Sequence, residues 1–449
     1  MRKLSLFFFF LLFVSPAFSQ QVVIDSTLNS RYLNHELYYF EDPEGRLAIK
    51  DVLKERQFIQ VKKDILNLLV TRSVFWIRFT VHNRNSTTKN LVEVVQPLLT
   101  RADFFEPDSN NNYIETKAGQ DFRFLQRAEP NSANFAYPLN LKPGETKIYF
   151  LRISSKAQML IPIHIVTERA LTVTIISRNL WFGIYCGIII VMVLYNLFIF
   201  FSIRDKSSLY YVLHTLFVGL TQATLVGYTY KYLWPENIWF GTYSTFLLTC
   251  LVSIVGVQFL IEFMRLKQQE KKLYYTLKFF QVLYVIYIVL SALGFYTEIY
   301  GAILATQIVI AFFIVGASIY LLRKGYSEAK FYLIGWFSLM TGIVIYVLKD
   351  MGLIDYNPFT AYSLLYGSAA EVTLLSFALA DKINIYKLEK EKSQEKEILA
   401  VIENERIVRE QNVMLESMVN ERTHELRIVN DDLVKVLKDL KDAEGQLVE

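Results

Sequence analysis

Apolar stretches of similar length dominate the middle of the chain. Each is close to the roughly 20 residues that an α-helix needs to cross the hydrocarbon core of a bilayer. The fourth and fifth stretches are separated by so short a turn that they should form a helical hairpin. The pattern predicts a bundle of seven membrane-spanning helices embedded in lipid, at about residues 180–202, 209–230, 240–262, 277–297, 299–322, 331–349 and 360–380.

Shorter segments of alternating apolar and polar residues precede the bundle, from about residue 21 to residue 170. They lie between turn clusters such as Lys142-Pro143-Gly144-Glu145 and are rich in β-branched and aromatic residues, which is typical of short strands. Residues 147–154 are apolar on both faces, as expected of a covered central strand in a β-sandwich. Because side chains alternate along a strand, one face of the clearest strand is expected in the core: Phe75, Ile77, Phe79 and Val81.

The last part of the chain, residues 383–449, is rich in charged, helix-forming residues and contains no proline. Its apolar side chains recur at alternating steps of three and four, which predicts a coiled coil. Asn412 at a seam position favours a two-stranded register, so a parallel homodimer is expected. The seam comprises Ile398, Val401, Val408, Leu415, Val419, Leu426, Val429, Leu433, Val436, Leu440, Ala443 and Leu447, with Glu405, Asn412 and Arg422 as polar members.

Two features predict the orientation in the membrane. Residues 1–19 combine Arg2 and Lys3 with an apolar run and then small residues, as a signal peptide does, so the strand-rich region is expected outside. The positive-inside rule then places the C-terminus in the cytoplasm. The outer connections hold only Lys231 and Lys349, whereas the inner loops hold Arg204, Lys206, Arg265, Lys267, Lys271, Lys272, Lys278, Arg323, Lys324 and Lys330.

Composition and motifs argue against several classes of function. Hydrophobic residues make up 53% of the chain, and the net charge of +4 is spread over short loops, which argues against nucleic-acid binding. Cys186 and Cys250 fall in predicted membrane helices, so no disulfide framework or cysteine metal site is expected. The sequence has no Gly-rich phosphate loop and no His-Glu-x-x-His motif, and its five histidines are scattered. We predict no catalytic residue, metal site or cofactor.

Candidate ligand contacts lie in the strand-rich region. Trp76, Arg78 and His82 share the second face of the clearest strand, and an aromatic ring beside a charged donor suits a sugar. Arg101 and Asp103 follow the bend at Pro97 and could line the same face. Alternatively, Trp76 packs between the two sheets and Arg78 pairs with a carboxylate.

Polar residues inside the predicted spans form a second group of candidates. Glu371 falls in the middle of the seventh span, where a carboxylate is costly and suggests a function. It is either a protonatable element of a switch or a hydrogen-bond partner of Tyr or Ser across the bundle. Glu371 and Asp381 are the candidates for coupling the bundle to the coil. The remaining polar residues are expected to hydrogen-bond between helices: Asn196, His214, Gln222 and Gln258.

Several short motifs carry a resemblance that extends over roughly residues 35–385. They are Val74-Phe75-Trp76-Ile77-Arg78-Phe79, Gln96-Pro97-Leu98-Leu99, Gly183-Ile184-Tyr185-Cys186-Gly187 and Leu194-Tyr195-Asn196-Leu197-Phe198. With these motifs the chain resembles bacterial seven-transmembrane receptors with diverse intracellular signalling modules. The resemblance implies a jelly-roll sandwich related to carbohydrate-binding modules, a location in the bacterial inner membrane and a sensory role.

The coil has a resemblance of its own. Residues 420–449 are similar to the segment that precedes the phospho-acceptor helix of many sensor histidine kinases. The 449 residues contain neither that acceptor motif nor an ATP-binding domain. Two interpretations therefore stay open: the chain is part of a longer kinase, or its coil engages a separate signalling partner.

Together these patterns predict three parts: an all-β jelly-roll sandwich over residues 21–170, a seven-helix bundle over 178–382 and a cytoplasmic coiled coil over 383–449. The hypothesis is a receptor that senses a small molecule or glycan in the periplasm and relays the signal to a histidine kinase of a two-component system. A transporter with a substrate-capturing β domain is the alternative, although no internal repeat is evident. An intramembrane enzyme would need a second polar residue beside Glu371.

Overall fold

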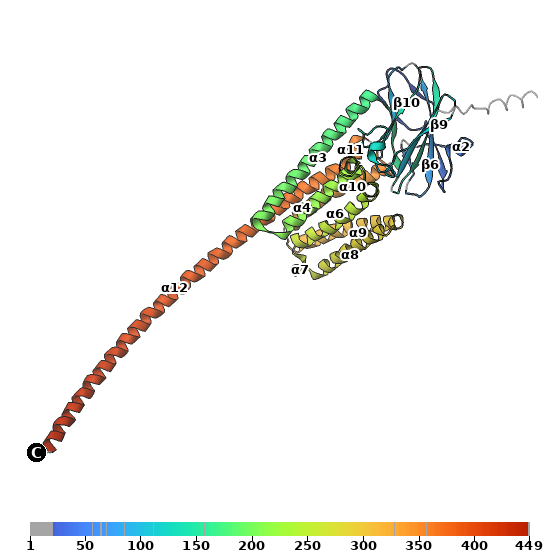
Figure 1. Cartoon of the computed structure of the whole chain (residues 1–449). Helices are drawn as coiled ribbons and strands as arrows, with labels where there is room; N and C mark the ends of the chain where they lie inside the picture. The colour runs from blue at the N-terminus through green and yellow to red at the C-terminus, as the bar shows by residue number, and fades with distance from the viewer. Residues whose placement is uncertain are drawn as a thin grey trace, which may run out of the picture. The chain divides into compact units, whose positions relative to one another are not determined.

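The structure is a computed structural model that describes residues 21–447 except 56, 63–64, 69, 85, 111, 157, 327, 352 and 356 (Figure 1). The predicted signal peptide, residues 1–19, lies outside the described residues. The chain divides between Leu379 and Ala380 into two compact units.

The first unit begins with two packed β-sheets. The larger sheet has the strand order β4-β3-β6-β11-β8-β9, with β1 beside β6, and the smaller has the order β10-β7-β13-β2, whereas β12 and β5 pair separately. A short helix α2 (Ile49–Val52) and a 3-10 turn (Phe124–Gln126) interrupt the strands. The strands are β1 (Val22–Ile24), β2 (Ser30–Leu33), β3 (Tyr38–Asp42), β4 (Ile59–Gln60), β5 (Leu66–Asn67), β6 (Val74–Asn83), β7 (Asn90–Val94), β8 (Arg101–Pro107), β9 (Tyr113–Thr116), β10 (Phe135–Leu139), β11 (Thr146–Ser154), β12 (Leu160–Ile161) and β13 (Ile163–Thr167).

The core between the sheets confirms the predicted alternation. All four predicted core side chains of β6 are buried, and they belong to one apolar cluster with Val92 and Ile163 of the smaller sheet. Strand β11 lies between β6 and β8, as expected of a strand that is apolar on both faces. The core therefore follows directly from the two-residue period of the sequence.

Ten helices are described after the sandwich. Six of them are long and apolar enough to cross a membrane, namely α3, α6, α8, α9, α10 and α12. Their number is one fewer than the seven predicted spans, because the 20-residue α4 is less apolar and includes Lys206, His214 and Gln222. The helices are α3 (Glu168–Ile203), α4 (Lys206–Leu225), α5 (Tyr228–Tyr232), α6 (Ile238–Phe263), α7 (Leu266–Gln269), α8 (Lys271–Ala292), α9 (Tyr296–Arg323), α10 (Glu328–Asp350), α11 (Pro358–Ala361) and α12 (Ser363–Leu447).

The connections of the bundle differ from the predicted pattern at two places. The second apolar stretch is not one helix: α4 ends at Leu225, and Gly227, with φ of +82°, turns the chain into α5. Helix α3 begins directly after β13, where the Thr167 hydroxyl accepts a hydrogen bond from the Ala170 N–H. This is a helix N-cap. The predicted hairpin is confirmed by the short turn between α8 and α9 at Gly294.

Two glycines bring α10 and α12 into backbone contact. A Cβ atom placed on Gly342 would lie 2.6 Å from the Ser363 carbonyl oxygen, and one placed on Gly367 would lie 3.1 Å from Cα of Gly342. Small residues commonly allow such close packing between membrane helices. The start of α12 is therefore held tightly against α10.

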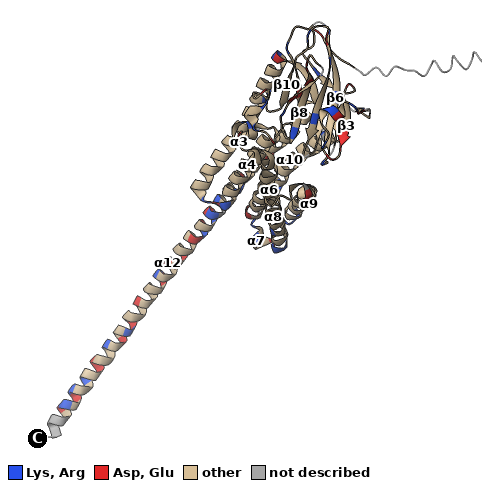
Figure 2. Ribbon diagram, turned by 45° about the vertical axis from the view of Figure 1, so that its right-hand side comes forward, with Lys and Arg blue, Asp and Glu red and all other residues tan. Residues whose placement is uncertain are grey.

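The second unit is the part of α12 after Leu379. It is helical throughout its described length, and acidic and basic residues alternate along it in Figure 2. The apolar side chains of the predicted seam from Ile398 to Leu440, among them Val408 and Leu426, are more than half exposed. The unit is thus a single amphipathic helix. That two copies of it pair as a coiled coil stays a prediction.

We predict that Gly342→Ala destabilises the protein by about 1–3 kcal/mol, because the new methyl group overpacks the contact between α10 and α12. The measurement is thermal unfolding of the purified protein in detergent. Gly316→Ala is the matched control, since a Cβ on this helical glycine of α9 meets nothing within 4 Å. It should leave stability unchanged or raise it by up to about 1 kcal/mol. Equal stability of the two variants would contradict the tight contact.

Candidate functional site

The outer face of the large sheet holds all five predicted ligand contacts. Trp76 is completely buried there in a second small apolar cluster with Val52, Phe105 and Phe150. Its ring centroid lies 5.1 Å from that of Phe105. Trp76 therefore does not pack between the two sheets, and it contributes to a packed layer on their outside.

Arg78 and His82 lie further along the same face of β6. The guanidinium group of Arg78 lies over the rings of Phe58 and Tyr38, at 4.5 and 5.2 Å from their centroids. These are cation–π distances, and partial burial lowers the pKa of Arg78. His82 Nδ1 lies 2.9 Å from the Thr146 hydroxyl. Arg78 and His82 remain partly accessible, and a role for them in ligand binding stays a prediction.

Arg101 and Asp103 form an ion pair on β8, with 2.9 Å between guanidinium and carboxylate. Asp103 is fully buried and lies opposite Arg152 in the register of β8 and β11. Burial raises the pKa of Asp103 to about 6, although the positive charge of Arg101 opposes the shift. A carboxylate in this position is costly to ionise.

A second buried carboxylate, Glu93 on β7, was not among the predicted site residues. It lies directly opposite His164 in the register of β7 and β13, and its Oε2 atom is 2.5 Å from His164 Nε2. Arg178 of helix α3 donates a hydrogen bond of 2.6 Å to Oε1 of Glu93, and Asn134 donates another of 2.9 Å. Glu93 therefore joins the smaller sheet to the first long helix.

The partners of Glu93 decide its charge. Burial alone would raise the pKa of its carboxyl group, but the hydrogen bond from His164 and the charge of Arg178 outweigh burial and lower the pKa to about 2. Glu93 is therefore ionised at neutral pH. The first turns of α3 cover the same outer sheet face with Leu171 and Ile175, which pack beside Leu91.

Further contacts attach the sandwich to the segment around α5. The Tyr230 hydroxyl donates to the carbonyl oxygen of Phe122 at 2.6 Å, and Lys231 Nζ donates to that of Asn131 at 2.6 Å. A Cβ atom on Gly227 would lie 2.7 Å from Cβ of Pro97, so this glycine lies directly against the sandwich. The two parts of the first unit are thus joined at α3 and again at α5.

Hydrogen bonds also hold the start of α12 to α3 and α4. Asn196 donates to the Ser376 hydroxyl at 2.8 Å, and Tyr211 donates to the Val372 carbonyl oxygen at 2.6 Å. Glu371 is completely buried, with Oε1 3.4 Å from Nε2 of His214. The expectation that Asn196 and His214 bond between helices is confirmed. Asp381 lies further along α12, in the second unit.

A cavity of about 940 Å³ connects the sandwich to this polar group. Gln96, Pro97 and Lys156 of the sandwich line one end, and most of the remaining wall is formed by residues of α3, α4, α6, α9, α10 and α12, including His214 and Glu371. Such a volume is in the range of small-molecule sites. No sequence pattern indicated this cavity, because its wall comes from segments that are far apart in the chain.

Comparison with protein families covers both parts of the first unit. Residues 34–167 match the family model described as 7TMR-DISM extracellular 2, and residues 178–382 match the model described as 7TM diverse intracellular signalling. The chain belongs to this receptor family. The resemblance predicted from the sequence is confirmed, and the two models of this receptor family cover about three quarters of the 449 residues.

As a member of the 7TM receptors with diverse intracellular signalling, the protein is a multi-pass membrane receptor with an extracellular sensing domain. A comparison with curated proteins found no match. Within the described part of the chain, no group of three or more His, Cys, Asp or Glu side chains is arranged to hold a metal ion.

We predict that Glu93→Gln destabilises the receptor by about 3–5 kcal/mol at pH 7, because it leaves the partly buried Arg178 without its counter-charge. The folded-state pKa of Glu93, about 2, lies below its ordinary value of 4.5, so the stability due to ionisation is present above pH 4.5 and is lost as the pH falls toward 2. The stability difference between wild type and variant, measured by thermal unfolding, should shrink over that range. A stability difference that does not change with pH would contradict the lowered pKa of Glu93.

Asp103→Asn should change the stability of the receptor in the opposite direction. The folded-state pKa of Asp103, about 6, lies above its ordinary value of 3.8, so the neutral acid contributes stability below pH 3.8 that is lost as the pH rises through 6. The variant, which stays neutral, should be more stable than wild type by about 1–3 kcal/mol at pH 8. The advantage should disappear near pH 4. A less stable variant at pH 8 would show that the ion pair with Arg101 outweighs burial.

Proposed function

We propose that the protein is a sensory receptor of the bacterial inner membrane that binds a small molecule at its periplasmic side and relays this event to a cytoplasmic output. The observation that carries the proposal is that helix α3 contacts both the sandwich and the last helix. Its Arg178 guanidinium group pairs with Glu93 of the sandwich, and its Asn196 donates a hydrogen bond to the Ser376 hydroxyl of α12. One helix thus connects the sensing domain to the last helix.

The proposed relay runs through α12. Ligand binding shifts the sandwich on the bundle, and the contacts of Glu93 and Arg178 bias two arrangements of the last helix. Because a ligand shifts such an equilibrium only as far as its affinity for the two arrangements differs, the bound state must strain or relieve these contacts. Helix α12 continues without interruption from Ser363 to Leu447, which supports transmission along its length.

The proposed output is a histidine kinase of a two-component system, either further along the chain or as a separate partner. The similarity of residues 420–449 to the segment before a kinase core supports this output. The basic inner loops support a cytoplasmic C-terminus. All seven predicted spans are needed for that orientation, so α4 is included as a membrane-spanning helix despite its lower hydropathy.

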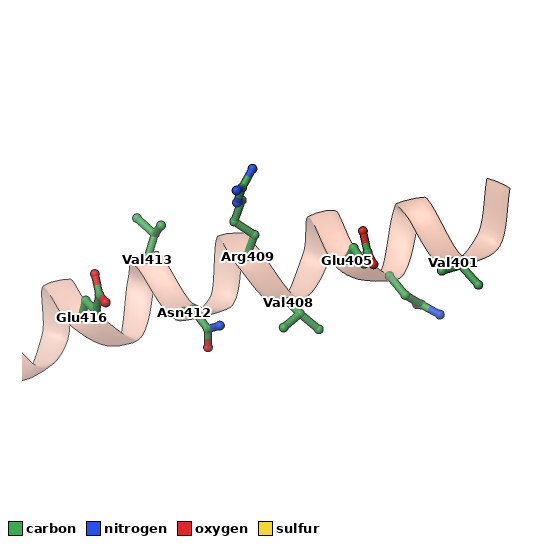
Figure 3. A pocket seen from close by; sticks show the side chains of 8 residues that line it. Val401, Glu405, Val408, Arg409, Asn412, Val413 and Glu416 are labelled. Carbon is green, nitrogen blue, oxygen red and sulfur yellow. The ribbon is translucent and has the colours of Figure 1, made fainter. Parts of the chain in front are cut away.

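The proposal includes a parallel homodimer through the coil. Figure 3 shows Val401, Val408 and Asn412 on one side of α12, and Arg409 and Val413 on the opposite side. Val408 is 54% exposed in the single helix, and a second copy would cover this apolar stripe. Asn412 in the seam would fix a two-stranded register.

The dimer is tested by disulfide crosslinking of the full receptor in membranes, in a background with Cys186→Ser and Cys250→Ser. Val408→Cys should give a crosslinked dimer rapidly, because seam residues of the two copies face one another. Arg409→Cys is the matched control on the opposite side of the helix and should crosslink at most slowly. Equal crosslinking at both positions, or none at Val408→Cys, would rule out the seam.

A further inference from the structure

The inference concerns the cavity between the sandwich and the bundle and rests on the proposed receptor function. At about 940 Å³ the cavity is large enough for a small molecule. Because it extends from Lys156 of the sandwich to Glu371 in the middle of the bundle, an occupant would contact both the sensing domain and α12.

The wall of this cavity is largely apolar. Helices α9, α10 and α12 contribute aliphatic and aromatic side chains, such as Ile303, Trp336 and Leu365. Helices α4 and α6 contribute hydroxyl groups, but Thr249 and Ser253 donate theirs to carbonyl oxygens of their own helix. An occupant therefore meets an apolar environment with few available polar groups.

Glu371 and Trp336 are exceptions among the wall residues, and Nε1 of Trp336 has no hydrogen-bond partner among the described residues. Only Glu371 is acidic. Its side chain is completely buried, and Oε2 has no hydrogen-bond partner among the described residues. Nδ1 of His214, on the other side of the contact, is likewise without a partner and faces Gly256, where a Cβ would lie 3.0 Å away. A buried carboxylate oxygen without a donor is costly. The site therefore lacks one hydrogen-bond donor of the kind that a ligand can supply.

We propose that the cavity binds a small apolar amine whose ammonium group pairs with Oε2 of Glu371. An ammonium group would supply both the missing donor and a counter-charge, and its apolar body would lie among the side chains of α9, α10 and α12. The other charged residues of the wall are cationic: Lys156, Arg178 and Lys349. They would repel the ammonium group, which fixes the orientation of the ligand, and Lys349 already lies 3.9 Å over the Tyr346 ring.

The test uses n-octylamine, 1-octanol and octanoate as probes of equal chain length on the purified full-length receptor in detergent. Binding is measured as a saturable rise of the unfolding temperature with probe concentration. Octylamine should bind about tenfold or more tightly than octanol, and octanoate should not bind. Equal binding of amine and alcohol would show that the cavity takes any alkyl chain, as a lipid tail would, and would overturn the proposal.

Two substitutions test whether octylamine binds in the cavity. Glu371→Gln should weaken octylamine binding by about tenfold or more, whereas Glu262→Gln, at a bundle glutamate outside the cavity wall, should not change it. If Glu371→Gln does not fold, Ile303→Trp replaces it and should abolish binding by filling the cavity. Unchanged octylamine binding in folded Glu371→Gln, or in Ile303→Trp where it takes its place, would overturn the proposal.

The receptor function is tested separately by the same probe. Octylamine is added to the Val408→Cys receptor, and the rate of crosslinking between copies is followed. A changed rate supports both proposals. Specific binding without a changed rate keeps the cavity site and contradicts its coupling to the relay, whereas absent binding overturns the cavity site alone, because the relay does not depend on this ligand.

Discussion

A charged group cannot remain unpaired in a protein interior without a large cost in free energy, and Glu93 is such a group. Its carboxylate is fully buried beneath the first turns of α3 and is held by His164, Asn134 and Arg178. Only Arg178 comes from outside the sandwich. The position of α3 on the sheet is therefore set by the need of this carboxylate for a counter-charge.

The contact between Glu93 and Arg178 fixes the position of α3 more than it stabilises the fold. A buried ion pair loses much of its Coulomb energy to desolvation, and apolar replacements are often equally stable. Breaking the pair, however, leaves an uncompensated charge, so alternative placements of α3 on the sandwich are strongly disfavoured. A ligand that shifts the sandwich relative to α3 would strain this contact, and that is what a sensor requires.

The last helix is held in the same way, by few but specific contacts. Asn196 and Tyr211 bond it to α3 and α4, and the glycine pair Gly342 and Gly367 brings it against α10. Close packing of this kind tends to have discrete arrangements rather than a continuous range. Helix α12 is thus suited to two-state behaviour, and the exposed seam beyond Leu379 would report that state between copies.

Much of the fold could be predicted because its determinants are periodic. The two-residue period gave the core of β6, and apolar runs of about 20 residues gave the long helices. Alternation tells which face of a strand a side chain occupies but not what covers that face, so the apolar layer that buries Trp76 on the outside of the sheet was not predictable. The contact of Glu93 with Arg178 joins residues 85 positions apart and has no sequence signature. The cavity beside Glu371 likewise depends on how helices from distant parts of the sequence pack together.

The most direct test of the account is the distance between spin labels at Asn404→Cys in the two copies of the cysteine-free receptor, measured by pulsed electron paramagnetic resonance. Glu93→Gln, which breaks the contact with α3, should shift the distance distribution relative to the otherwise wild-type receptor. Asp103→Asn, which changes a buried sandwich carboxylate without contact to α3, should not. An unchanged distribution in folded Glu93→Gln receptor would contradict the claim that this contact couples the sensing domain to the output helix.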